Sequence, residues 1–280
     1  LPVIAGGSDG GLANLSAGGW GDGRVVVTVG TSGAIRMISD RPRLDDSGQR
    51  TWCYVLLGGR WFHGGAINNG GLALQWVHDR FYQVGHAGAS GASPDTYDTM
   101  MREAERIAPG CDGLTMLPYF TGERSPYFDS EARGMLLGMN LSHGRGHVAR
   151  AAMEAVAMCL ADVWQVAVGK SRVEQVRLTG GINRSGVWRQ IVADVLGVEL
   201  RCIEAADASA MGAAMIGHLA VGSIPSLDAA ATWGDLGPVV RPDEIRHAHY
   251  RRQHERFTQL ARTLVFARGD ATTPSNEKSR

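Results

Sequence analysis

The sequence predicts an α/β fold in which a sheet of mixed direction is covered by helices. In the first part of the chain, short apolar runs are joined by tight turns, which is the pattern of β-hairpins. In the second part, apolar runs of strand length alternate with stretches whose apolar residues recur at helical spacing. The 280 residues are 44% hydrophobic and 20% charged, so the chain is long enough to bury a sizeable core.

Hairpins are expected in the first part of the chain. Residues 1–7 are expected to form a short strand that runs into a glycine-rich turn, and because domains seldom begin so abruptly, an N-terminal portion is expected to be absent. Residues 25–29 pair with 34–38, and after a polar loop at 41–50, residues 51–57 pair with 61–63. Asn68-Asn69-Gly70-Gly71 then leads into a helix that ends near residue 82.

Helices and strands alternate in the second part. After a loop at 85–94, Asp95 is the expected cap of a helix through residue 106, and Ser142 is the expected cap of a long helix whose apolar positions run from 148 to 163. Strands are expected at 114–119, 134–139, 173–179 and 199–203, and further helices at 185–196, 209–221 and 243–264. Residues 266–280 have little apolar content and are expected to be a disordered tail.

Charge and hydropathy exclude several classes of partner. The 28 basic and 28 acidic side chains balance, and no basic tract occurs, so nucleic acid and membrane surfaces are not expected partners. No apolar run reaches the roughly 20 residues that a membrane helix needs. The four cysteines lie far apart with no CxxC pair, which is typical of reduced thiols in a cytoplasmic protein.

Two segments point to phosphoryl transfer. The turn Gly30-Thr31-Ser32-Gly33 joins two apolar β-rich runs, and its small residues allow several backbone N–H groups to face one anion. Asp9 lies 21 residues before Gly30 in a glycine-rich stretch, where a carboxylate can orient an alcohol and accept its proton. The alternative, that Asp9 only caps its own turn, is outweighed by the nearby hairpin.

A third segment, Gly180-Gly181-Ile182-Asn183-Arg184-Ser185, lies between an expected strand and helix. A nucleotide binds at such positions in α/β sheets, and paired glycines let the backbone approach a base or a phosphate, while Ser185 can cap the helix. An ordinary strand–helix turn explains the segment equally well. No metal site is expected, because the paired histidines at 143/147 and 247/249 have no companion ligand at metal spacing, and no GxSxG elbow indicates a hydrolase.

The chain resembles the C-terminal half of the FGGY carbohydrate kinases. Gly134-Met135-Leu136-Leu137-Gly138-Met139, followed after seven residues by His147-Val148-Ala149-Arg150-Ala151-Ala152-Met153-Glu154, matches the second signature of that family. The segments Ser8-Asp9-Gly10, 28–36, 68–71, Gly122-Glu123-Arg124-Ser125-Pro126 and 187–190 are most similar to the gluconate kinase branch, with xylulose kinases next.

The resemblance implies an actin-like, ribonuclease-H-like ATPase fold, with a mixed sheet and helices on both faces, and a C-terminal kinase domain at residues 1–265. It implies that Asp9 is the catalytic base, that the turn around Thr31 contacts the terminal phosphates of ATP, and that Gly71 and Gln75 line the nucleotide. Gly180, Gly181 and Ser185 then correspond to the turn beside the adenosine.

By resemblance the reaction is transfer of a phosphoryl group from ATP, with Mg²⁺, to gluconate, and xylulose or another pentulose is the alternative acceptor. The family's N-terminal domain, which carries the first phosphate hairpin and most sugar contacts, has no counterpart here, so the isolated chain is expected to be inactive. If the chain is complete as given, a non-catalytic ATP-binding or scaffold role is the alternative. A homodimer is possible.

Overall fold

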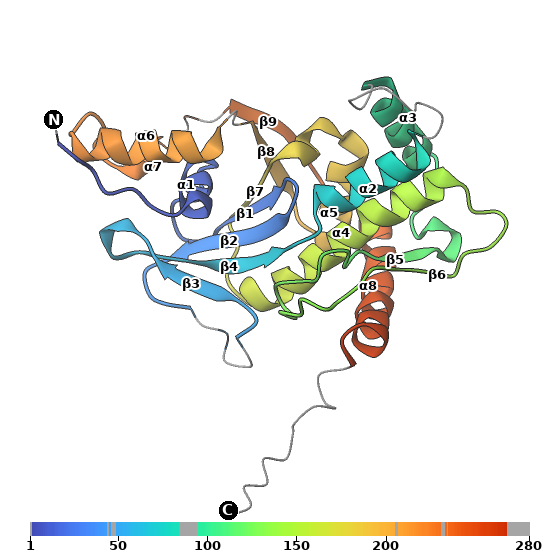
Figure 1. The fold of residues 1–280 in the computed structure, drawn as a ribbon. Coiled ribbons are helices and arrows are strands. Elements are labelled where there is room, and N and C mark those ends of the chain that lie inside the picture. Colours follow the sequence, from blue (N-terminus) through green and yellow to red (C-terminus); the bar gives the residue numbers. More distant parts are fainter. Residues whose placement is uncertain are drawn as a thin grey trace, which may run out of the picture.

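A mixed sheet forms the centre of the computed structural model, which describes residues 2–43, 45, 49–83, 94–204, 207–230, 233 and 235–267 (Figure 1). Within these residues the seven strands follow the order β3-β4-β2-β1-β7-β8-β9. β1 pairs in parallel with β7, and β7 with β8, whereas the other neighbouring pairs are antiparallel. The strands are β1 (Arg24–Val29), β2 (Gly33–Ser39), β3 (Trp52–Val55), β4 (Trp61–Ile67), β7 (Gln175–Thr179), β8 (Leu200–Glu204) and β9 (Asp235–Val240), and a separate ribbon pairs β5 (Thr115–Leu117) with β6 (Met135–Leu137).

Helices cover both faces of the large sheet, as expected (Figure 1). One face carries α2 (Gly71–Phe81), α3 (Pro94–Glu105), α4 (Arg145–Ala167), α5 (Gly186–Leu196) and α8 (Glu244–Leu264), and the other carries α1 (Asp9–Ser16), α6 (Ala208–Ala220) and α7 (Leu227–Ala230). Alternation along β2 separates two cores: Ile35 and Met37 join the larger one under α4, whereas Ile38 joins the smaller one under α1 and α6.

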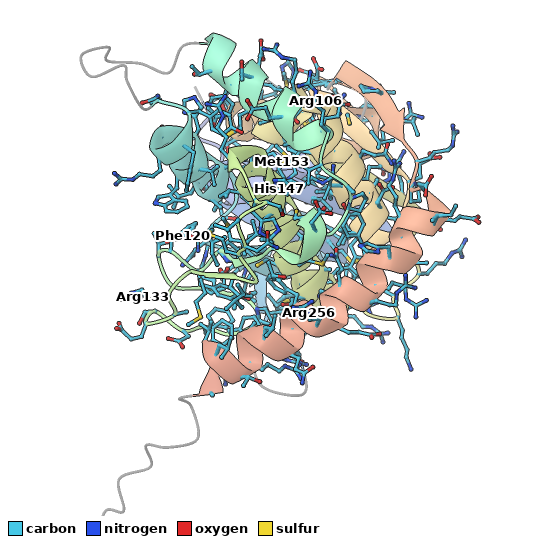
Figure 2. The ribbon with its side chains drawn as sticks, turned by 90° about the vertical axis from the view of Figure 1, so that its right-hand side faces the viewer. Arg106, Phe120, Arg133, His147, Met153 and Arg256 are labelled. Atoms are coloured by element: carbon cyan, nitrogen blue, oxygen red, sulfur yellow. The ribbon has the colours of Figure 1, made fainter. Side chains whose placement is uncertain are left out.

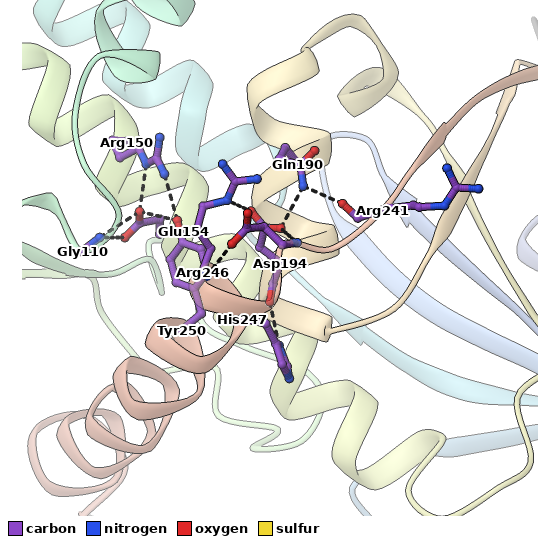
Figure 3. Close-up of polar contacts among 10 residues, drawn as sticks. Gly110, Arg150, Glu154, Gln190, Asp194, Arg241, Arg246, His247 and Tyr250 are labelled. Carbon is purple, nitrogen blue, oxygen red and sulfur yellow. Dashed lines mark hydrogen bonds and ion pairs between the residues drawn. The ribbon is translucent and has the colours of Figure 1, made fainter.

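The long helix α4 is buried almost all round, and it carries an ion pair inside. Arg150 Nε donates to Glu154 Oε1 at 2.9 Å, and the Tyr250 hydroxyl of α8 donates to the same oxygen at 2.8 Å. The backbone N–H of Gly110 completes this set (Figure 3). Every partner is buried, so these hydrogen bonds between α8 and α4 are shielded from solvent.

A second polar contact in Figure 3 attaches α8 to α5. Asp194 Oδ2 lies 2.7 Å from Nε of Arg246, and Asp194 Oδ1 accepts from the Gln190 side chain at 2.8 Å. Figure 2 views the molecule from the side that carries α3, β5, β6 and α8, with Arg256 on α8 and Met153 on α4. The two attachments make α8 part of the helical layer that backs the sheet.

The first residues of the chain differ from the expectation. Residues 2–8 form no strand, and the glycine-rich stretch after them is the start of helix α1 rather than a turn. Val3 is fully exposed, so its side chain contributes nothing to the core. The two glycines of α1 lower its intrinsic helix propensity, so the packing of α1 on α6 stabilises it.

Two expected helix caps were wrong, and one strand was missed. Helix α4 begins at Arg145 with Gly144 as its N-cap, because the Ser142 hydroxyl donates to Asn140 instead. Helix α3 already includes Pro94, so Asp95 lies inside it. The missed strand β9 contains Pro238, which an edge strand tolerates. Residues 85–93 and 268–280, where a loop and a disordered tail are expected, lie outside the described residues.

Candidate active-site cleft

The turn between β1 and β2 presents backbone donors. The N–H of Gly30 donates to Ser32 O at 2.9 Å and closes the turn. Thr31 and Ser32 are exposed, and in the part of the chain that the structure describes their amides donate to no backbone group. Two free N–H groups in a bend between strands form a small anion-binding surface.

The N-terminus of helix α2 is fastened to the same turn. The amide of Gly71 donates to Gly30 O at 2.7 Å, and the amide of Leu72 donates to Thr31 O at 3.0 Å. A Cβ on Gly71 would lie 2.7 Å from Gly30 O, so this contact requires glycine. These first amides of α2 are already bonded to protein, and an anion in the cleft would meet the amides of Thr31 and Ser32 instead.

The turn between β7 and α5 forms the opposite wall. Gly180 has φ +102°, and a Cβ there would lie 2.4 Å from Val29 O, so the glycine allows β7 to end directly against β1. Ser185 is the N-cap of α5, where its Oγ accepts the amide of Trp188 at 3.2 Å. The expected cap is confirmed, and the cap fixes the start of α5 beside the cleft.

These elements enclose a cavity of about 560 Å³ at the carboxyl ends of the parallel strands β1 and β7. Among the residues singled out from the sequence, six line it: Gly30, Thr31, Gly71, Gln75, Gly181 and Ser185. Ser32, Gly33 and Gly180 shape the two turns without lining the cavity, and Asp9, in the first turn of α1, does not line it either. The sequence did not point to the apolar side chains that complete the wall, which are Leu74, Tyr97, Met101, Ile182 and Trp188.

Asp9 lies at the first turn of α1. The hydroxyl of Ser8 accepts the amide of Gly11 at 3.2 Å and caps the helix, while Asp9 Oδ1 accepts the amide of Gly10 at 2.6 Å. The hydroxyl of Ser209 on α6 donates to the carbonyl of Asp9 at 3.1 Å and fixes its backbone. Asp9 is exposed, so its carboxylate is open to a ligand rather than packed among apolar groups.

Arg36 lies between the start of α1 and strand β1, which leads into the turn Gly30-Thr31-Ser32-Gly33. Its Nη1 donates at 3.0 Å to Oγ1 of Thr28, two residues before the turn, and its Nε and Nη2 lie 3.5 Å from where a Cβ of Gly10 would be. Burial lowers the pKa of Arg36 to about 10, and the attraction of Asp9 opposes that change. In the sequence, the indication that Arg36 has a special role is that it is a charged residue flanked by the apolar residues of β2.

The loop before β6 holds the segment that leads into α2. Glu123 Oε1 accepts the amide of Asn68 at 2.6 Å, and Arg124 donates to Asn68 Oδ1 at 2.6 Å and to Ile67 O at 3.0 Å. Glu123 is buried, which raises its pKa to about 7. Arg124 also repels Arg36 electrostatically.

Two further features, a metal-binding cluster and a membrane-spanning helix, were sought within the described ranges. These ranges contain no group of three His, Cys, Asp or Glu side chains placed to bind a metal ion. Within the same ranges no helix has the length and apolarity to span a membrane.

The sequence was compared with known families and proteins. The model of the C-terminal domain of the FGGY family of carbohydrate kinases matches residues 25–221. A gluconokinase of Bacillus licheniformis is 38% identical over 267 residues, which cover 94% of this chain and 52% of the relative. A xylulose kinase of Bacillus subtilis is 30% identical, with 82% of this chain and 44% of the relative covered.

Solved structures of similar fold agree with these relatives. A gluconate kinase from Lactobacillus acidophilus superposes with a TM-score of 0.81 and 26% identity, and a xylulose kinase from Rhodospirillum rubrum with 0.80 and 29%. The matches cover 92% and 94% of this chain but 51% and 52% of those structures. The chain therefore spans about half the length of the relatives that it matches.

Proposed function

The chain belongs to the FGGY family of carbohydrate kinases, and we propose that it supplies the catalytic base and half of the ATP site for phosphoryl transfer to a hydroxyl of a sugar or sugar acid. In this proposal residues 1–265 form the C-terminal domain of the kinase. The observation that carries it is the placement of Asp9 beside Arg36, which is bonded to strand β1. In this proposal the turn Gly30-Thr31-Ser32-Gly33 after β1 binds the phosphates of ATP, and we call it the phosphate turn.

Asp9 acts on the acceptor alcohol. Its exposed carboxylate orients the hydroxyl and accepts its proton as the new bond to phosphorus forms. The helix cap by Ser8 and the bond from Ser209 hold the backbone of Asp9 in place, so the carboxylate needs little reorganisation.

The donor side of the cleft fits a nucleoside triphosphate. The amides of Thr31 and Ser32 are free to bind phosphate oxygens, and the cavity beyond them has the apolar walls and the size that suit a base and a ribose. ATP supplies the phosphoryl group when it is bound. Because no metal-binding cluster occurs among the described residues, Mg²⁺ would be held mainly by the phosphates and by groups outside this set.

Gluconate is the proposed acceptor, and xylulose or another pentulose is the second candidate. The higher identity to a gluconokinase than to a xylulose kinase supports this order. A panel of gluconate, xylulose and glycerol, tested on the complete protein with a coupled ADP assay, decides between the acceptors. We expect the highest kcat/KM for gluconate, and a higher value for xylulose would overturn the assignment.

The isolated chain offers a second test, of a non-catalytic ATP-binding role. The coverage of about half of each relative favours weak nucleotide binding without turnover for this polypeptide alone. Calorimetry with ATP and Mg²⁺, followed by the ADP assay, separates the roles. Turnover by the isolated chain would show that these 280 residues hold a complete site, contrary to the proposed half site.

A further inference from the structure

We propose that Arg36 is a positioning residue for Asp9, and that it directs the carboxylate toward the acceptor hydroxyl. This inference rests on the proposed function, because it takes Asp9 as the base. It adds a residue whose role follows from the packing of α1 on β2.

The strand register places Arg36 below α1. Arg36 is paired with Val26 on β1 and Gly64 on β4, and its side chain points to the same face of the sheet as that of Thr28. A Cβ on Gly64 would lie 2.1 Å from Ile35 O, so glycine at this position lets β4 approach β2 closely beside Arg36. The bond from Nη1 to Thr28 then fixes the guanidinium between the start of α1 and the phosphate turn.

The guanidinium is not saturated by protein. Nε is buried and has no hydrogen-bond partner among the described residues, although an arginine in the interior normally uses its donors. Asp9 Oδ1 accepts the amide of Gly10 in this structure, and it does not accept from the guanidinium. Nε and Nη2 face Gly10, the neighbour of Asp9 in α1, so these donors lie next to the backbone that carries the carboxylate.

Charge explains why the arrangement matters for the reaction. Among the described residues, Asp9 attracts the guanidinium and Arg124 repels it, while α6 faces this site with the uncharged Ser209. The half-buried guanidinium is thus favoured by the nearby anion. The same attraction draws the side chain of Asp9 toward Arg36 and restricts its rotation.

The test is a double-mutant cycle in the complete protein, with Arg36→Met, Asp9→Asn and the double variant. We expect Arg36→Met to lower kcat about 10- to 100-fold with a small change in the KM for ATP, and to add almost nothing in the Asp9→Asn variant. Arg36→Lys, which keeps the charge, recovers part of the rate.

Thr28→Val is a second variant that leaves Arg36 in place and removes only its anchor, so it serves if Arg36→Met fails to fold. We expect a smaller loss of kcat, again absent when it is combined with Asp9→Asn.

Arg60→Met, at an exposed ion pair with Asp22, is the matched control and keeps the parent rate. Equal loss from Arg36→Met with and without Asp9→Asn would overturn the positioning role. Full activity of Asp9→Asn would instead overturn the proposed function.

Discussion

Glu123 is a buried carboxyl whose charge is disfavoured by its surroundings. It accepts the amides of Asn68 and Arg124, yet its Oε2 has no partner among the described residues, and burial raises its pKa to about 7. Between about pH 4.5 and 7 the folded protein binds a proton at this position that the unfolded chain has already released. The contribution of Glu123 to the free energy of unfolding is therefore fully present at low pH, and it is lost as the pH rises to about 7.

We predict that Glu123→Gln flattens the pH dependence of stability in this window. Glutamine keeps an oxygen for Asn68 but carries no charge, so the variant gains up to about 3 kcal/mol relative to the parent between pH 5 and pH 8. Urea unfolding at several pH values measures the difference, and the histidines common to both proteins cancel. Glu131→Gln, at an exposed position, is the control. If the plots of unfolding free energy against pH were parallel for the parent and for Glu123→Gln, Glu123 would not be the source of the pH dependence.

Single residues of the site were predictable where their chemistry is local. The turn at Gly30 and Thr31 and the cap at Ser185 follow from residue type and spacing, and the structure places all three along one cavity. The role of Arg36 was not predictable in the same way. It depends on the register between β1 and β2 and on the packing of α1, which no short segment encodes.

Elements with strong periodicity were predicted well. The first hairpin, the long helix α4 and the alternation of β7, α5, β8 and α6 were confirmed, because their apolar spacing matches their final burial. Helix α1 was mistaken for a turn because its glycines favour one locally. Its stability comes from α6, where Gly212 is so close to α1 that a Cβ would lie 2.0 Å from Leu12 O.

The contact between α2 and the phosphate turn depends on glycine at position 71. We predict that Gly71→Ala displaces the turn, since its Cβ would collide with the carbonyl of Gly30, and that stability falls by about 1–3 kcal/mol. ADP affinity, measured by calorimetry, falls with it. Gly217→Ala, where a Cβ meets nothing within 4 Å, is the matched control on α6. A Gly71→Ala variant with parental stability and affinity would show that the contact is not needed.

The buried ion pair between Arg150 and Glu154 on α4 leads to a further prediction about stability. Arg150→Met leaves Glu154 without its cation inside the protein, and we expect a loss of about 3–5 kcal/mol in the free energy of unfolding. Arg172→Met, at an exposed pair with Glu174, should change stability by less than about 1 kcal/mol. Urea unfolding compares them. Similar small losses for both would mean that water or a rearranged contact replaces Arg150.

In the whole molecule, the two helical layers on the central sheet contribute different parts of the proposed site. The layer of α2, α4, α5 and α8 encloses the larger core and one side of the cavity at the ends of β1 and β7, whereas the layer of α1 and α6 carries Asp9. The parallel strands β1 and β7 end between these layers. The sequence predicted the mixed sheet and both layers, but the packing of α1 beside Arg36 of β2 became visible only in the folded chain.

The central claim is that the carboxylate of Asp9 is the base for phosphoryl transfer in this cleft. The most direct measurement is acceptor-dependent ADP formation by the complete protein and by its Asp9→Asn variant, with ADP affinity measured in parallel and Asp22→Asn as the exposed control. We predict that kcat of Asp9→Asn falls at least ~100-fold while ADP binding is unchanged. Turnover of that variant within a few-fold of the parent would contradict the account.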